Sequence, residues 1–305
     1  MTRARARPGE ALVVAALLAA GVLIAHGWCL ADGTVLDDWW HQKGLREHGW
    51  SPPELLRTLV IAPGDFTHLW WQTREVRFEY ARPLFILCMK LAYGVVGGND
   101  PLALHALSLL LHYAAALMVW QLCRWVTGSA PWSVLGAIIF VIYPHAGITV
   151  AWPSSQNCLL QTVFMLGALL CYLRASGLRS PLEPPAGEAA PLRRGPLLAA
   201  VLLWVLALFS RENALMLPAV LGALDLALGG WRTVRRRVGA YGLMAVIAVA
   251  FVAWRSAVVS DGLPDVYMRR PEGDLPAYAA WAFAKLVHYV AAAVWVAPMM
   301  VGPTG

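Results

Sequence analysis

Long runs of apolar residues, separated by short polar segments, dominate the chain. The first run, 11–30, is about as long as the stretch of helix that crosses the hydrocarbon core of a bilayer. Further apolar runs cover residues 102–123, 131–151, 157–173, 197–229, 239–259 and 276–301. The run 197–229 is too long for one crossing and is interrupted by the polar tripeptide 211–213, so it predicts a helical hairpin of 197–210 and 213–229. The pattern predicts an all-α, polytopic membrane bundle with about eight spanning helices.

A shorter apolar piece, 83–97, lies between the first two of these runs. It is short for a full crossing and contains Lys90, so we expect it to be re-entrant or peripheral. The alternative is that it crosses the bilayer and inverts the orientation of everything downstream. In the polar segment 31–82, residues 51–71 (SPPELLRTLVIAPGDFTHLWW) predict two short amphipathic helices divided by the Pro-Gly step at 63–64. Helices of this kind lie in the membrane interface, with tryptophan at the level of the headgroups.

Composition supports the membrane assignment. Of the 305 residues, 59% are hydrophobic and only 14% are charged, whereas a soluble domain carries about a quarter charged residues. The net charge of +6 comes mostly from arginines in short loops, so it reports topology and not nucleic-acid binding. The five cysteines have neither metal-ligand nor disulfide-framework spacing. The sequence supports no cofactor, and two adjacent acids alone are weak grounds for a divalent metal.

The distribution of arginine orients the chain. Arg3, Arg5 and Arg7 precede the first apolar run and place the N-terminus in the cytoplasm. The basic N-terminus also fits a signal peptide, but the run that follows is longer than a usual signal core, so we expect an uncleaved first span. The arginine-containing segments 174–196 and 231–239 are expected in the cytoplasm too.

Working backwards from those segments places 31–82, the AWPSSQN segment at 151–157 and the hairpin tip at 210–213 on the outside. We therefore expect one transmembrane domain over 1–305, with 31–82 as its first extracytoplasmic loop and 175–196 as a flexible, proline-rich cytoplasmic linker. Such a chain would be a multi-pass protein of the bacterial inner membrane.

With this topology, the unusual polar residues gather on the outer side. They are Asp37, Asp38, Arg82, Asn99, Asp100, Gln156, Asn157, Arg211 and Glu212. A carboxylate can take a proton from an acceptor hydroxyl, and arginines can hold a phosphate leaving group. Each feature also has a plainer interpretation: the acid pair as a helix cap, Arg82 as an interface anchor, and Arg211-Glu212 as a self-neutralising pair in a tight turn.

The order of these pieces carries a resemblance. Asp37-Asp38 in the first outer loop is followed by Arg82-Pro83-Leu84, HALSLLLH (105–112), FVIYPHAGITVAWPSSQN (140–157) and FSRENALMLP (209–218). The chain resembles the GT-C superfamily of membrane glycosyltransferases, especially the protein O-mannosyltransferase-like and ArnT-like enzymes. The resemblance implies an enzyme that moves a hexose or pentose from a polyprenyl-phosphate carrier to a protein or lipid acceptor on the extracytoplasmic side.

The resemblance also implies roles for residues. The first-loop acid is the catalytic base or the group that orients the acceptor, which by position falls on Asp37 with Asp38 beside it; Arg82 would contact the carrier phosphate, and Arg211 stands where relatives usually have lysine. The substrate-binding set is expected to be Arg82, Arg211, Glu212, Gln156, Asn157, Trp152, Trp39 and His41.

This sequence departs from the family pattern at three places. It has Trp40 where ArnT-like enzymes have a basic residue, and Gln156 where mannosyltransferase-like members often have arginine. It ends at GPTG directly after an apolar run, where relatives continue with more spans or a soluble domain, so we expect a C-terminally truncated form.

Two other classes of protein compete with the enzyme. A transporter or flippase of lipid-linked sugars would place its buried polar residues near the bilayer midplane on broken helices, often in repeated halves. In this sequence they gather at one face, and no repeat is visible. A non-catalytic membrane assembly protein would use Asp37-Asp38 only as a cap.

Overall fold

The computed structural model describes residues 8–34, 38–58, 60–61, 78–96, 101–183, 191–259 and 274–294. The chain forms two compact units, one made of residues 1–60 and 80–260, the other of residues 61–79 and 261–305. The single membrane domain expected over 1–305 stays a prediction.

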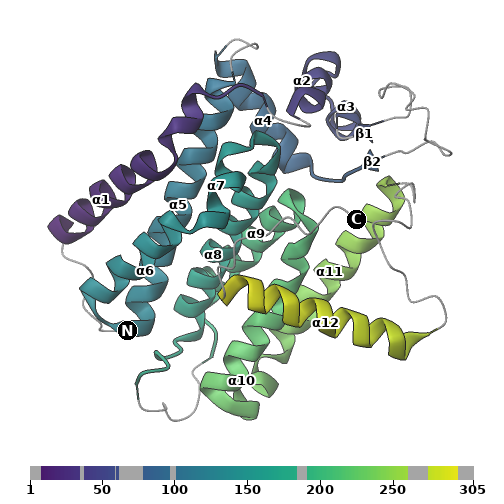
Figure 1. The fold of residues 1–305 in the computed structure, drawn as a ribbon. Helices are drawn as coiled ribbons and strands as arrows, with labels where there is room; N and C mark the ends of the chain where they lie inside the picture. The colour runs from purple at the N-terminus through teal and green to yellow at the C-terminus, as the bar shows by residue number, and fades with distance from the viewer. Residues whose placement is uncertain are drawn as a thin grey trace. The chain divides into compact units, whose positions relative to one another are not determined.

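The first unit is a helical bundle (Figure 1). Its helices are α1 (Pro8–His26), η1 (Gly27–Ala31), α2 (Asp38–Glu47), α3 (Pro52–Arg57), α4 (Pro83–Val96), α5 (Leu102–Thr127), α6 (Ala130–Ile142), α7 (Pro144–Ala151), η3 (Pro153–Ser155), α8 (Gln156–Ser176), α9 (Arg194–Ser210), η4 (Glu212–Met216), α10 (Leu217–Arg236) and α11 (Val238–Val258). The remaining elements are β1 (Val60–Ile61), β2 (Phe78–Glu79) and α12 (Leu275–Val294).

The protein is an all-α polytopic membrane protein, as the apolar runs predict. Within the described residues, five helices are long and apolar enough to cross a bilayer, and a sixth crossing is made if the bent pair α6–α7 counts as one. This is fewer than the eight expected. The helix α9, with 17 residues, is shorter than a full span, and the run expected over 276–301 extends past Val294, the last described residue.

The run 131–151, expected as one span, is divided into two helices in the structure. It breaks at Tyr143, so that α6 and α7 meet at an angle of 56°. Pro144 explains the break, because proline disfavours helical backbone in the residue before it and has no N–H to donate. Tyr143 accordingly has ψ of 123°, outside the helical range.

Two buried histidines compensate for this break. The carbonyl oxygen of Val141, near the end of α6, accepts hydrogen bonds from Nε2 of His26 at 2.8 Å and Nε2 of His112 at 3.4 Å. The two rings meet edge to face, with their centroids 5.1 Å apart. A carbonyl that the broken helix leaves unpaired is therefore bonded by side chains from α1 and α5.

Polar contacts define the two ends of the bundle in the first unit. At one end, here called the Asp38 end, Asp38 of α2 bonds Ser154 of η3. At the opposite end of α8, here called the Arg237 end, Arg237 Nη2 donates to the carbonyl of Ser176 at 2.9 Å. The described contacts of Asp38, of the segment 151–157 and of the hairpin tip at 210–213 lie at the Asp38 end, whereas the orientation of the bundle in the membrane stays a prediction.

A buried charge network closes the Arg237 end. The carboxylate of Asp225, fully buried in α10, accepts hydrogen bonds of 2.6 Å from Arg237 Nη1 and from the hydroxyls of Tyr172 and Tyr241. Between the two charges α10 bends at Gly230, whose φ of 71° lies in the left-handed region that favours glycine. The network joins α8, α10 and α11.

The short helix α4 lies against α2 and the residues that directly follow α2. Its Lys90 donates to the carbonyls of His48 and Gly49, and its Tyr93 hydroxyl accepts from Nη2 of Arg46 at 2.8 Å. Both α4 and the next helix, α5, begin at the Asp38 end, where Arg82 precedes α4. The expectation that the piece 83–97 is re-entrant or peripheral stays a prediction.

The amphipathic segment at 51–71 is only partly helical. The first expected helix is present as α3, which begins with a bond of 2.5 Å from the Ser51 hydroxyl to the carboxylate of Glu54. It ends earlier than expected, because Val60–Ile61 is extended and pairs with β2; β-branched residues favour strands. The Pro-Gly step and the second expected helix lie outside the described residues.

Candidate functional site

The site begins with Asp38, the first residue of α2, whose side chain is fully buried. Its Oδ1 accepts a hydrogen bond of 2.8 Å from the backbone N–H of Ser154 and one of 2.5 Å from the Ser154 hydroxyl. Both donors belong to η3, so this oxygen reaches another element of the fold. Asp37, the other member of the acid pair, lies outside the described residues.

A chain of hydrogen bonds leads from η3 to the break between α9 and α10. Asn157 Nδ2 donates to the carbonyl of Ser154 at 2.7 Å, and Asn157 Oδ1 accepts from Nη1 of Arg211 at 3.0 Å. The same guanidinium nitrogen contacts the sulfur of Cys158. Arg211 has extended backbone, with φ of −164° and ψ of 141°, and this interruption brings its side chain to α8.

Glu212, the next residue, continues the chain of contacts. Its Oε2 accepts from Nη2 of Arg82 at 3.1 Å and from Nε of Arg82 at 3.3 Å, and its Oε1 accepts from Nε of Arg255 at 3.5 Å. The guanidinium of Arg82 also lies over the ring of Tyr80, 4.6 Å from its centroid. One partly buried carboxylate is thus shared between arginines that come from the start of α4 and the end of α11.

These contacts form one cluster, here called the outer network. It consists of Asp38, Ser154, Asn157, Arg211, Glu212, Arg82 and Arg255. Three arginines face two carboxylates, which leaves an excess positive charge in the cluster. Guanidinium groups make strong, charge-assisted bonds to phosphate, so this arrangement suits an anionic group near the membrane surface.

The contacts of the outer network can be compared with the interpretations of its members as a helix cap, an interface anchor and a self-neutralising pair. Arg211 bonds Asn157 whereas Glu212 bonds Arg82, so the adjacent Arg211 and Glu212 each turn to a different partner. Arg82 makes an ion pair with Glu212, and its side chain is only 16% exposed. An arginine that only anchors the chain at the membrane interface would need neither. The Oδ1 of Asp38 bonds Ser154 of η3, a contact that a helix cap does not require.

Gln156 was expected to bind substrate, but its hydrogen bonds point away from the outer network. It is fully buried, and its Nε2 donates to the carbonyl of Leu104 at 2.5 Å and to the hydroxyl of Ser108 at 3.0 Å. Its Oε1 has no hydrogen-bond partner within the described part of the chain. The side chain joins α8 to α5, beside the outer network.

The three aromatic residues of the expected site are spread over two elements. His41 is buried and meets the ring of Phe85 edge to face, with centroids 5.8 Å apart. Trp152 ends α7 directly before η3. Trp39 is 57% exposed and stacks edge to face on Trp40 at 4.8 Å.

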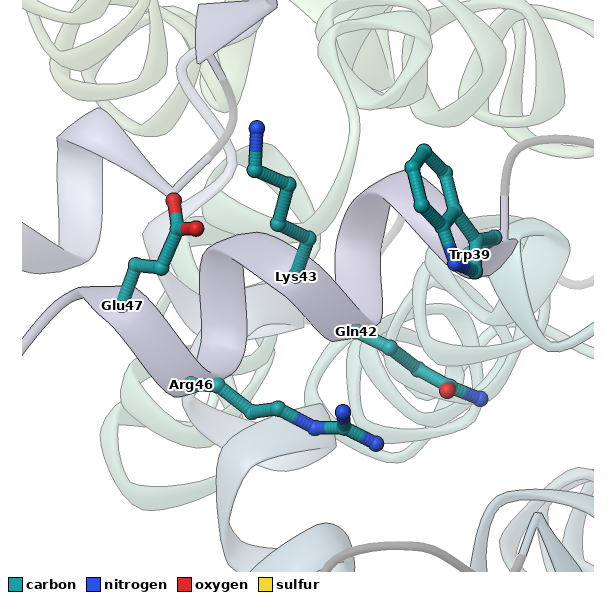
Figure 2. Close-up of a pocket in the computed structure, with 5 residues that line it drawn as sticks. All are labelled: Trp39, Gln42, Lys43, Arg46 and Glu47. Atoms are coloured by element: carbon teal, nitrogen blue, oxygen red, sulfur yellow. The ribbon is translucent and has the colours of Figure 1, made fainter. Parts of the chain in front are cut away.

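A pocket of about 310 Å³ lies on α2, the helix that begins with Asp38 (Figure 2). Its lining residues share one stretch of helix: Trp39, Gln42, Lys43, Arg46 and Glu47. Figure 2 shows Lys43 and Glu47 extending to one side of α2 and Gln42 and Arg46 to the other. The pocket offers an aromatic surface together with charges of both signs.

Sequence reasoning missed two members of the outer network. Ser154 lies inside the AWPSSQN segment, but a serine in such a segment has no signature of its own. Arg255 had a usable signal, because an arginine inside the apolar run 239–259 is an ionisable residue at membrane depth. Within the described residues, no group of three or more histidine, cysteine, aspartate or glutamate side chains is placed to hold a metal ion.

Comparison with known proteins gives two distant relatives. The chain is 31% identical over 93 residues to Protein O-mannosyl-transferase tmtc2 of Xenopus laevis, covering 30% of this chain and 11% of that protein. It is 27% identical over 164 residues to Protein O-mannosyl-transferase TMTC3 of Homo sapiens, covering 52% of this chain and 17% of that protein. The chain therefore spans only a small part of the length of these relatives. No family model and no solved structure matches it.

Proposed function

We propose that this protein is a membrane glycosyltransferase of the GT-C type, which moves a sugar from a polyprenyl-phosphate carrier to a hydroxyl group of a protein. The outer network carries the proposal, because it gathers carboxylates and arginines from four separate places in the fold at one end of a membrane bundle, through hydrogen bonds and the peptide bond between Arg211 and Glu212. The names of the two distant relatives, both protein O-mannosyl-transferases, support transfer to protein.

The arginines are proposed to hold the phosphate of the donor. A guanidinium has five N–H donors, and the contacts of Arg82 with Glu212 engage its Nε and Nη2, which leaves a further nitrogen for a phosphate oxygen. Arg211, at the break between α9 and α10, reaches Asn157 of α8 and would supply a second guanidinium. Positive charge at this position would stabilise the phosphate as the bond to the sugar breaks.

The acids are proposed to serve the acceptor. Asp37 would take the proton of the attacking hydroxyl as a general base. Asp38, whose Oδ1 already accepts two bonds from Ser154, would orient the start of α2 instead of meeting the substrate directly. Trp39, exposed on the wall of the α2 pocket, offers a flat surface for a sugar ring.

The proposed topology puts this chemistry on the extracytoplasmic side of the membrane. The Asp38 end would face the periplasm and the Arg237 end the cytoplasm of a bacterial inner membrane, with the N-terminus inside. The lipid-linked donor and the protein acceptor would then meet at the periplasmic surface of the inner membrane.

A transfer assay tests the proposal. The purified protein in lipid nanodiscs is incubated with a serine- and threonine-containing peptide and a panel of polyprenyl-phosphate sugars, and glycosylated peptide is detected by mass spectrometry. We expect transfer from one donor, its loss in Arg211→Ala and its retention in Arg57→Ala, which removes an exposed arginine of α3. Movement of a lipid-linked sugar across liposomes without any transfer would overturn the proposal in favour of a transporter.

A further inference from the structure

The helix α2 is fixed at both of its ends, by different parts of the bundle. At its N-terminal end Asp38 bonds Ser154 of η3. At its C-terminal end, the ammonium group of Lys90 from α4 donates to the carbonyl oxygens of His48 and Gly49, the latter at 2.6 Å. We propose that Lys90 is a positioning residue, which holds α2 so that Asp38 at its start keeps its place beside η3. This inference rests on the proposed function of Asp37 and Asp38.

Lys90 is an unusual residue for its surroundings. It is only 6% exposed, although it lies in the middle of α4, a short helix of otherwise mostly apolar residues. Burying an ammonium group is costly unless hydrogen bonds and charge compensate it. The carbonyls of His48 and Gly49 provide that compensation, and the ring of Trp50 adds a cation–π contact at 5.2 Å.

The position of the ammonium group suits the electrostatics of α2. The C-terminal end of a helix carries unpaired carbonyls and a partial negative charge, which a cation stabilises. Lys90 supplies that cation from α4, just past Glu47, where α2 ends. Asp38 begins α2 at the opposite end, where the helix carries partial positive charge. Lys90 therefore favours both the position of α2 and its helical state.

Two more contacts from α4 support the same arrangement. The hydroxyl of Tyr93 accepts from Nη2 of Arg46 at 2.8 Å, and Phe85 packs against the ring of His41. Along its length α4 thus contacts α2 on successive turns. The side chain of Lys90 is the contact that can be removed with the least change of shape, because methionine has a similar length and no charge.

A double-mutant cycle on transfer activity tests the proposal. We expect Lys90→Met to lower kcat by roughly tenfold to a hundredfold, since a misplacement of about 1 Å in a catalytic group has effects of this size. The KM for the lipid donor should stay unchanged, because the proposed phosphate ligands are not on α2. Lys90→Arg should restore most of the activity, since arginine can also donate to both carbonyls.

Coupling to Ser154 separates positioning from a general loss of structure. If Lys90 acts through the bond between Asp38 and Ser154, the losses in Lys90→Met and Ser154→Ala should be less than multiplicative in the double variant. Multiplicative losses, or an equal rise in the donor KM, would overturn the proposal. Arg57→Met, at an exposed arginine of α3, serves as the matched control and should leave kcat unchanged.

A measurement independent of activity keeps this inference distinct from the proposed function. In hydrogen-exchange mass spectrometry, Lys90→Met should speed exchange in peptides covering 38–47 and 153–156 and leave those covering α9 unchanged. If the wild type transfers no sugar but this exchange pattern appears, the glycosyltransferase proposal fails and the positioning of α2 stands. Unchanged exchange at 153–156 would overturn the positioning role, whatever the activity.

Discussion

Asp38 and Ser154 lie 116 residues apart in the sequence, yet one carboxylate oxygen of Asp38 accepts both the backbone N–H and the hydroxyl of Ser154, at 2.8 and 2.5 Å. The aspartate begins the first helix after α1 and η1, and the serine lies in the turn between the bent helix α7 and α8. This pair ties the start of α2 to the turn before α8, at the Asp38 end of the bundle.

The first prediction concerns this pair. Asp38→Asn should lower activity only modestly, because the Oδ1 of asparagine can still accept from both donors of Ser154. Asp38→Ala should destabilise the protein by about 1–3 kcal/mol for each donor left buried and unpaired. Thermal unfolding in detergent, read beside activity, checks both variants; equal stability of the alanine and wild-type proteins would contradict the burial of this carboxylate.

The second prediction concerns Asp37. If it is the general base, Asp37→Asn should reduce the transfer rate by roughly 10²–10⁴ while the protein stays folded. A capping role predicts little change, since asparagine caps helices about as well as aspartate. Transfer kinetics on protein of matched unfolding temperature decides between them. Wild-type turnover in Asp37→Asn would exclude the catalytic role.

The third prediction concerns the donor phosphate. Arg82→Ala and Arg211→Ala should each weaken donor binding by about 1.5–3 kcal/mol, or roughly tenfold to a hundredfold in affinity. A titration with polyprenyl phosphate measures this effect. Because Arg82→Ala also leaves Glu212 with Arg255 as its remaining arginine partner, Arg82→Ala/Glu212→Gln is the control. Unchanged affinity in both single variants would leave these arginines as structural groups.

The fourth prediction concerns orientation. In a background without the native cysteines, Ser51→Cys should react with an impermeant maleimide added to intact cells, and Arg232→Cys should react only after lysis. Both positions are exposed, so burial does not limit labelling. The expectation follows from the arginine-rich segments, which the positive-inside rule predicts to be cytoplasmic. Labelling of both positions in intact cells would mean that the piece 83–97 crosses the membrane, since that crossing would invert only the residues that follow it.

The fifth prediction concerns the Arg237 end. Asp225→Ala should lower stability by about 3–5 kcal/mol, because it leaves the buried guanidinium of Arg237 without its carboxylate. Asp225→Ala/Arg237→Met should recover a large part of that loss by removing the unpaired charge as well. Thermal unfolding of the two variants measures the difference. Equal losses in both would show that the charge pair is not what stabilises this end.

Hydrophobic pattern predicted most of the helices, because spanning segments are selected for length and apolarity alone. The bend at Tyr143 was missed although Pro144 signals it, since the run 131–151 is long enough for a straight span. The extended pair at Val60–Ile61 was missed as well. Its pairing with β2 depends on residues far along the chain, and no local pattern contains that information.

The residues expected at the site were easier to find than their partners. Charged residues beside apolar runs stand out in a sequence, and this signal located Arg82, Arg211 and Glu212. Which acid pairs with which arginine depends on packing, so the ion pair between Arg82 and Glu212, 130 residues apart, could not be predicted. The role of Lys90 was hidden for the same reason, since its carbonyl partners belong to the backbone.

The charge network at the Arg237 end has a consequence for how the chain is made. Asp225 lies near the middle of α10, where a lone carboxylate costs about 2.5–3.5 kcal/mol to insert into the membrane. Its hydroxyl partner on Tyr172 is synthesised well before it, but its cation, Arg237, follows 12 residues later. Insertion of α10 into the membrane by itself would therefore carry the full free-energy cost of an unpaired carboxylate. Release of α10 together with the start of α11, against an α8 already in the lipid, lets the charges leave water as a pair.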